Sequence, residues 1–155
     1  LAEGHVIEVT GRTGFGSPWD NYARVPLFYR YFLGGANTLR GFRYPQVGPR
    51  DSANEPIGGD TYYMGSVEYS VPVIPPVLRL AAFYDIGNVF SQPFSFNPNT
   101  AKGERIYQDD VGVGIRLNIP NLGPLRLDYA FPLTVDRNTS KSGRIQFSVG
   151  YTREF

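Results

Sequence analysis

Apolar and polar residues alternate with a period of two along much of the chain, which is typical of β-strands that have one apolar and one polar face. Turn-forming residues, mainly glycine, proline and asparagine, separate the alternating segments. The pattern predicts about six strands. They span residues 5–15, 61–71, 77–87, 111–119, 124–131 and 144–155.

The two faces of these strands differ in a way that bears on their surroundings. The polar faces carry glycine, serine and opposed charges such as Arg116, Arg126 and Asp128, as the wall of a water-filled lumen would. A soluble sandwich is the alternative, since its strands alternate too. The apolar faces gather aromatic residues, as interfacial girdles do. These are Tyr63, Tyr69, Tyr84, Tyr129, Phe131 and Tyr151.

The lengths of the strands and the alternation of long and short connections favour an outer-membrane barrel over a sandwich. The predicted strands run to about 9–11 residues, which suits a tilted membrane crossing. Long and short connections alternate strictly, as they do between the external loops and periplasmic turns of such barrels. We therefore predict an all-β, antiparallel transmembrane β-barrel with Phe155 on the periplasmic side. The connections are 17–60, 73–77, 88–109, 120–124 and 132–143.

Six strands are too few for a closed barrel of this type, which has at least eight. Open strand edges are not tolerated in hydrocarbon, because each unpaired N–H or C=O costs several kcal/mol. We expect the C-terminal part of a larger barrel: a strand in 1–16, a long external loop in 17–60 and five further strands in 61–155. The missing strands lie upstream of Leu1 or come from another copy or another protein, and the isolated chain is expected to self-associate. No signal peptide is recognisable.

Composition argues against several function classes. The net charge of +1 does not suggest a nucleic-acid partner, and the absence of cysteine excludes thiolate metal sites. With His5 as the single histidine, no nucleophile with a positioned base is evident, so we expect neither an enzyme nor a cofactor or metal. Asp109 and Asp110 with Asp60 or Glu55 form a possible divalent-ion site at the rim, but a solvated loop is the preferred interpretation.

The segment GGANTLRGF, residues 34–42, places Arg40 in the middle of the longest loop. Glu68 and Asp85 fall on the polar faces of two consecutive strands, where two carboxylates at close range repel unless a cation lies between them. The fork of an arginine can bind carboxylates bidentately and stays charged. Gly34, Gly35 and Gly41 would allow the sharp turns and close approach of a loop that folds back into the barrel. In the alternative interpretation, Arg40 is a solvated loop residue.

Four motifs, in order, resemble the C-terminal barrel of the bacterial surface-antigen superfamily. Leu39-Arg40-Gly41-Phe42 is similar to the [VL]RG[FY] motif at the tip of the family's sixth external loop. Residues 66–69 (SVEY), 83–89 (FYDIGNV) and 123–132 (GPLRLDYAFP) resemble three of its strand motifs, and Phe155 its terminal aromatic residue. The resemblance covers nearly the whole chain. The family includes the assembly factors BamA and TamA and the two-partner secretion transporters.

The resemblance implies a barrel of roughly sixteen strands preceded by periplasmic POTRA domains, both largely absent from this sequence. It implies that Arg40 docks against Glu68 and Asp85. The expected setting is the bacterial outer membrane, or the equivalent organelle membrane. The expected partners are its lipids, client barrel polypeptides, the missing N-terminal strands and POTRA domains, and accessory lipoproteins.

The last predicted strand resembles the C-terminal signal strand of barrel proteins, and in assembly factors this strand forms a weak lateral seam that recruits client strands. Gly150 would suit a bendable seam, although it could equally just make room in the lumen. The resemblance implies a non-enzymatic factor that folds and inserts barrels. Alternatives are a two-partner-type secretion transporter, a barrel enzyme and a passive pore. The expected seam residues are Phe147, Val149, Gly150, Tyr151 and Phe155.

Overall fold

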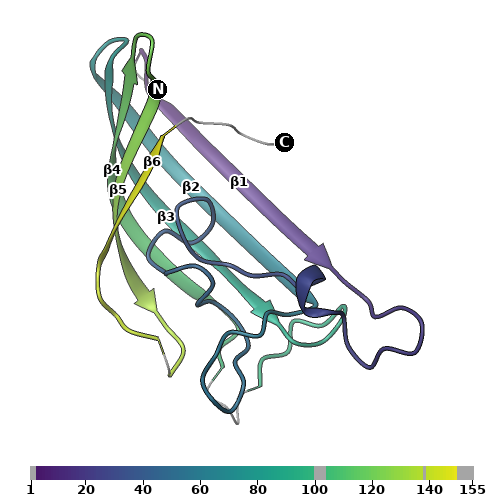
Figure 1. Cartoon of the computed structure of the whole chain (residues 1–155). Helices are drawn as coiled ribbons and strands as arrows, with labels where there is room; N and C mark the ends of the chain where they lie inside the picture. Colours follow the sequence, from purple (N-terminus) through teal and green to yellow (C-terminus); the bar gives the residue numbers. More distant parts are fainter. Residues whose placement is uncertain (1–2, 100–103, 138, 150–155) are drawn as a thin grey trace.

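The computed structural model describes residues 3–99, 104–137 and 139–149 and consists of one curved antiparallel sheet (Figure 1). Its six strands follow the order of the sequence, each pairing with the next. One short 3-10 helix, η1 (Leu27–Tyr29), interrupts the long loop after the first strand. The predicted all-β antiparallel fold is confirmed. The strands are β1 (Val6–Phe15), β2 (Thr61–Ile74), β3 (Leu78–Phe90), β4 (Gln108–Ile119), β5 (Gly123–Thr134) and β6 (Arg144–Val149).

The central strands are longer than the sequence pattern predicts. β2 has 14 residues and β3 has 13, against the expected 9–11. Residues 88–90 continue β3, where the prediction placed a loop, because they pair with residues 61–63 at the start of β2. Residues 108–109 likewise belong to β4. The strands thus continue into the loop region, where the alternation of apolar and polar residues no longer marks them.

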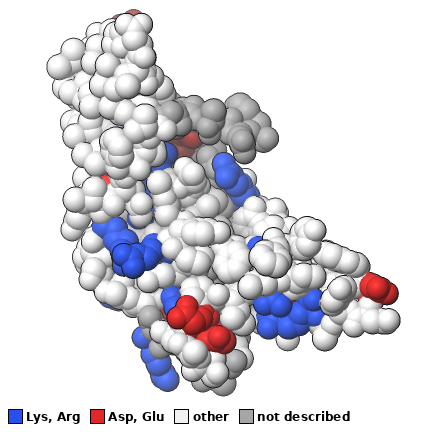
Figure 2. Space-filling view, viewed as in Figure 1, with Lys and Arg blue, Asp and Glu red and all other residues white. Residues whose placement is uncertain are grey.

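Long and short connections lie at opposite ends of the sheet. Residues 75–77 and 120–122 form the short turns β2–β3 and β4–β5. Residues 16–60, 91–107 and 135–143 form the long connections, which gather at the lower end in Figure 1. In the space-filling view, most of the visible charged side chains lie over this lower end as well (Figure 2). No helix among the described residues is long and apolar enough to cross a membrane.

The convex face of the sheet exposes the apolar side chains of the predicted pattern. Val9 on β1, Val113 on β4 and Ile145 on β6 are 73%, 61% and 71% exposed. Exposed apolar side chains of this face occur on all six strands, from Val9 on β1 to Val149 on β6. Large exposed apolar patches mark interaction or membrane surfaces. It is the face that the alternation assigned to lipid.

The opposite face is covered by the long loop, residues 16–60, which folds back across β2 and β3 (Figure 1). Leu39, Phe42 and Val47 from the loop are almost fully buried, and they pack with Met64 of β2 and Val89 of β3. Burial of each such side chain contributes about 1.5–3 kcal/mol. This small apolar core fixes the loop tip against the inner face of the sheet.

Candidate functional site

Arg40 lies at the centre of the docked loop tip and is only 4% exposed. Its Nε and Nη2 donate to the two carboxylate oxygens of Asp85, at 2.7 Å each, in a bidentate pair. Nη1 donates to Glu68 Oε2 at 2.6 Å, and Nη2 also donates to Ser66 Oγ at 3.1 Å. Planar bidentate pairing of this kind is specific to arginine. We call Arg40, Asp85, Glu68 and Ser66 the arginine clamp.

Phe83 supports the clamp from β3. The guanidinium carbon of Arg40 lies 3.4 Å from the centre of the Phe83 ring, which is itself buried. A desolvated cation over an aromatic face is stabilised by about 2 kcal/mol. The sequence analysis missed this partner, although a large aromatic side chain on the polar face of a strand, two residues before Asp85, was the available signal.

A second set of charges surrounds the clamp. Arg116 of β4 bridges Glu68 Oε2 at 2.7 Å and Asp128 Oδ1 at 2.5 Å. Arg126 of β5 donates to Asp128 Oδ2 at 2.7 Å and to the backbone carbonyl of Ala36 in the loop. Three arginines therefore neutralise three carboxylates across β2 to β5. The sequence analysis placed Arg116, Arg126 and Asp128 in the lumen but did not connect them to the loop.

The electrostatics favour a permanently charged Arg40. Burial disfavours the cation, but the hydrogen bonds and charges of Asp85 and Glu68 outweigh that effect and raise the pKa of Arg40 above its ordinary value. The guanidinium therefore remains protonated at any pH the folded protein meets. The clamp is therefore a structural ion-pair network.

The glycines of the loop tip are required for two different reasons. Gly34 and Gly35 have positive φ angles of 120° and 91°, which side chains rarely adopt. At Gly41 the reason is space, because an added Cβ would lie 2.5 Å from Cβ of Asp110. The tip therefore turns sharply and then rests directly on β4.

The tip is closed by its own hydrogen bonds. The N–H of Gly35 donates to the carbonyls of Leu39 and Phe42, at 3.1 and 2.8 Å. The N–H of Gly34 donates to Thr38 Oγ1 at 2.8 Å. These bonds present Arg40 to the sheet while Leu39 and Phe42 point into the apolar core.

The prediction of a solvated loop at Asp109 and Asp110 is wrong. Both belong to β4 and are buried, because pairing with β3 extends to Gln108 and the long loop covers Asp110. Asp109 accepts hydrogen bonds from the Tyr84 hydroxyl at 2.8 Å and from the Thr134 N–H at 2.9 Å. Within the described ranges, no group of three or more His, Asp or Glu side chains is arranged to hold a metal ion.

The last strand contacts the loop tip. Gln146 of β6 donates from its side-chain amide to the backbone carbonyl of Arg40 at 3.1 Å. Phe147 and Val149 of the expected seam point to the opposite, exposed face, at 62% and 53% exposure. The other expected seam residues, Gly150, Tyr151 and Phe155, lie outside the described residues.

The chain resembles several curated proteins, of which three come from a bacterium, an animal and a plant. It is 35% identical to the outer membrane protein assembly factor BamA of Nitratidesulfovibrio vulgaris over 97% of its length, which is 18% of that protein. It is 28% identical to the sorting and assembly machinery component 50 homolog of Bos taurus over 78% of its length, which is 28% of the relative. It is 35% identical to the chloroplastic outer envelope protein 80 of Arabidopsis thaliana over 77% of its length, which is 14% of the relative.

The chain thus spans less than a third of each of these proteins. The Omp85 superfamily domain matches residues 3–152, nearly the whole chain and all six strands. Together with the docked LRGF tip and the exposed apolar face of the sheet, this match shows that the chain belongs to the Omp85 superfamily of transmembrane β-barrels, the family that the sequence motifs indicated.

Proposed function

We propose that the chain is part of an outer-membrane assembly factor that folds and inserts β-barrel proteins without chemical catalysis. The observation that carries the proposal is the arginine clamp, which fixes the tip of a 45-residue loop, 16–60, to the wall with bonds of 2.6–2.7 Å. Burying these charges costs desolvation free energy, and the network holds the loop in one defined position against the barrel wall. The names of the relatives, an assembly factor and a sorting and assembly component, support the same function.

The arrangement in the membrane follows from the same proposal. Residues 17–60 form an external loop whose tip, Leu39 to Phe42, docks inward onto Glu68 and Asp85. The long connections face the exterior and the short turns the periplasm, so that the C-terminal end of β6 is periplasmic. The location is the bacterial outer membrane or the corresponding organelle membrane. The upstream strands and POTRA domains complete the protein, and lipids, client barrels and accessory lipoproteins are its partners.

The last strand is the proposed place of action on clients. Among the described residues, β6 pairs with β5. In the full-length protein, its other edge is the one at which an upstream strand closes the barrel and at which the seam opens to a client strand. An unpaired edge recruits another strand by β-augmentation. Phe147 and Val149 would then contact lipid or a client strand, and Gly150, Tyr151 and Phe155 would complete this seam. The isolated chain, with two open edges, is expected to self-associate.

Depletion of the full-length parent tests the proposal. Cells are rescued with the wild type, with Arg40→Ala, or with the exposed control Arg43→Ala, and the amounts of several unrelated outer-membrane barrels are quantified. We expect all barrels to fall on depletion, the wild type and Arg43→Ala to restore them, and Arg40→Ala to fail. If unrelated barrels persist while one exported protein disappears, the protein is a two-partner-type secretion transporter and the proposal is wrong.

A further inference from the structure

Asp110 is a buried acid that the arginine clamp leaves without a counter-charge. Its side chain is fully buried near the end of β4 that follows the long connection 91–107. Neither of its carboxyl oxygens has a hydrogen-bond partner among the described residues, and no ion pair between described residues includes it. An ionised carboxylate in such a place is very unfavourable, and a buried acid is normally neutralised instead.

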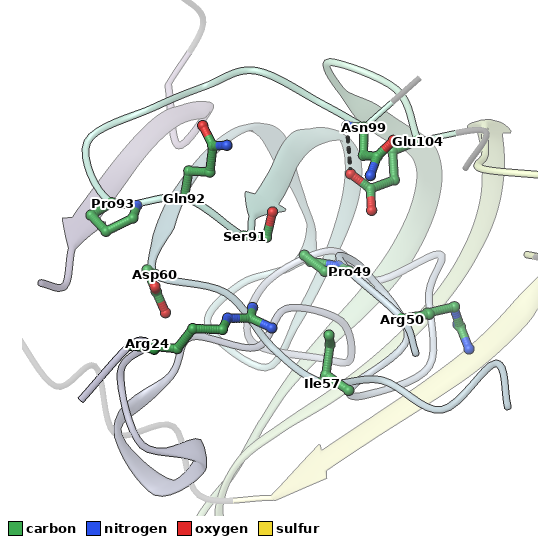
Figure 3. Close-up of a pocket in the computed structure, with 11 residues that line it drawn as sticks. Arg24, Pro49, Arg50, Ile57, Asp60, Ser91, Gln92, Pro93, Asn99 and Glu104 are labelled. Carbon is green, nitrogen blue, oxygen red and sulfur yellow. Dashed lines mark hydrogen bonds between the residues drawn. The ribbon is translucent and has the colours of Figure 1, made fainter. Parts of the chain in front are cut away.

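Asp60 is also a buried carboxyl group, but it lies near cations. It is 2% exposed, and one of its two oxygens has no hydrogen-bond partner within the described ranges. Figure 3 shows it beside Arg24 at the border of a cavity among the long connections. Burial raises the pKa of Asp60, whereas the charges of Arg24 and Arg30 and the backbone N–H of Val25 lower it. The oxygens of Asp110 have no comparable donors.

The groups that face Asp110 come from two neighbouring strands and from the loop tip. On β3, Asp85 is its cross-strand partner, so the two carboxyl groups lie side by side on the inner face. On β5, the opposite residue is Pro132, which has no N–H to donate. In the loop, Gly41 rests directly on Asp110, and Arg40 is the nearby cation. Arg40 is therefore the group that could balance a charge on Asp110.

The donors of Arg40 are directed to other acceptors. Its side chain donates to both oxygens of Asp85, to Glu68 and to Ser66, and none of these bonds reaches Asp110. Asp85 also accepts from the Ser66 hydroxyl at 2.6 Å, so it has charge-stabilising donors on both oxygens. Of two adjacent carboxyl groups, the one with donors keeps the negative charge and the one without them takes up a proton.

Tyr84 and Asp109 are further titratable groups next to this position. They point to the opposite face of β3 and β4, where the Tyr84 hydroxyl donates to Asp109 at 2.8 Å. On the inner face, three arginines are already matched by three carboxylates. An ionised Asp110 would be a fourth anion without a cation of its own, whereas a protonated Asp110 keeps the charges equal.

We propose that Asp110 is a proton-binding site that couples docking of the loop tip to pH. The docked tip encloses Asp110 as the neutral acid, with its O–H beside Asp85. When the tip lifts away, Asp110 meets water and releases the proton to it. The proposal rests on the docked position of Gly41 and on the absence of donors at Asp110, and it does not depend on the proposed assembly function.

The direction of the pH effect follows from this proton. At neutral pH the docked state holds one proton more than the undocked state, so docking weakens as pH rises. One proton changes the docking equilibrium by at most about tenfold for each pH unit. Asp136 also titrates, with a pKa of about 6. Measurements between about pH 7 and about pH 9 therefore separate Asp110 from Asp136.

Infrared difference spectroscopy of the full-length protein, in a detergent without ester groups, detects the proton directly. At about pH 7 the wild type should show the C=O band of a protonated carboxylic acid, and Asp110→Asn should lack it. Asp20→Asn, at an exposed aspartate, is the control and should keep the band. If the wild type and Asp110→Asn do not differ in this band, Asp110 is ionised and the proposal is overturned.

Hydrogen exchange of residues 33–47 measures the coupling to the loop, as protection factors relative to the unfolded peptide at each pH. Wild-type protection should fall as pH rises, by up to about tenfold for each pH unit. Asp110→Asn should lose this dependence, because asparagine is neutral and of nearly the same shape. Asp136→Asn should keep it in this range. Equal pH dependence in the wild type and Asp110→Asn would overturn the release of the tip, even where the infrared band is present.

Discussion

The guanidinium carbon of Arg40 lies 3.4 Å from the centre of the Phe83 ring, so that the most buried cation of the loop is stacked on an aromatic side chain of the wall. Asp85 and Glu68 hold the edges of the same guanidinium. Its edges and one of its faces are thus occupied, which explains how a charge can remain inside with little exposure.

Replacing Phe83 by leucine should weaken loop docking without removing a charge. We expect about 1–2 kcal/mol to be lost, because the cation–π contact disappears while the apolar volume is nearly kept. The measurement is denaturant unfolding of the full-length protein in detergent, together with amide hydrogen exchange of residues 33–47. Phe131→Leu, on the exposed face of β5, is the control. Equal losses in both variants would contradict the contact's role.

Removing the charge of Arg40 should cost more. In Arg40→Ala, the buried Asp85 loses both bonds from the guanidinium and keeps the one from the Ser66 hydroxyl, while Glu68 loses one of its two cations. Breaking a buried pair costs about 3–5 kcal/mol. Arg40→Lys keeps the charge but lacks the bidentate fork, so we expect an intermediate loss. Hydrogen exchange of residues 33–47 measures both. A lysine variant as stable as the wild type would show that charge alone holds the loop.

Gly41 and Gly11 form a matched pair for testing close approach. An alanine Cβ at Gly41 would meet Asp110 Cβ at 2.5 Å, whereas at Gly11 it would meet nothing within 4 Å. Neither glycine has a positive φ angle, so packing alone distinguishes them. We expect Gly41→Ala to cost about 1–3 kcal/mol by overpacking and Gly11→Ala to be neutral or slightly stabilising. Thermal unfolding of the two variants, compared with the wild type, measures this difference.

The period-two pattern was enough to predict the sheet, because every strand has one lipid-facing and one inward side. Parity also placed Glu68 and Asp85 on the inner face. The alternation could not give the distance of either carboxylate from Arg40, because the position of a residue along the barrel axis depends on the strand register. In the structure, Ser66 pairs with Asp85, and Glu68 pairs with Phe83. The ion pair between Arg116 and Asp128 depends on strand register, and the burial of Asp110 depends on the docked loop. The alternation of apolar and polar residues therefore could not predict either of them.

Asp136 should make the free energy of unfolding depend on pH, and the substitution Asp136→Asn should remove that dependence. Its carboxylate accepts the Arg105 N–H at 2.9 Å and the Gln108 amide at 2.8 Å, and so links two long connections. Burial raises its pKa from 3.8 to about 6. The folded state therefore binds this proton more tightly than the unfolded state, so the contribution of Asp136 to stability is greatest below pH 3.8 and is lost as pH rises to about 6.

The measurement is the unfolding temperature of the full-length protein between pH 4 and pH 8, for the wild type and Asp136→Asn. The wild type should gain stability relative to the variant as pH falls through about 6, and the difference between them should be constant above about pH 7. Asp51→Asn, at an exposed aspartate of another long connection, is the control. A difference that does not vary with pH would mean that Asp136 does not titrate in this window.

Gln146 should couple the loop tip to the last strand. Its amide donates to the Arg40 carbonyl at 3.1 Å, so the residue that anchors the loop on β2 and β3 also contacts β6. Gln146→Leu removes this bond and should cost about 1 kcal/mol. Because coupling between two sites is reciprocal, amide exchange should accelerate both in residues 144–149 and in residues 33–47. Ser148→Ala, on the same face of β6, is the control. If exchange accelerates in β6 alone, the bond stabilises that strand locally and does not connect the docked loop to the proposed seam.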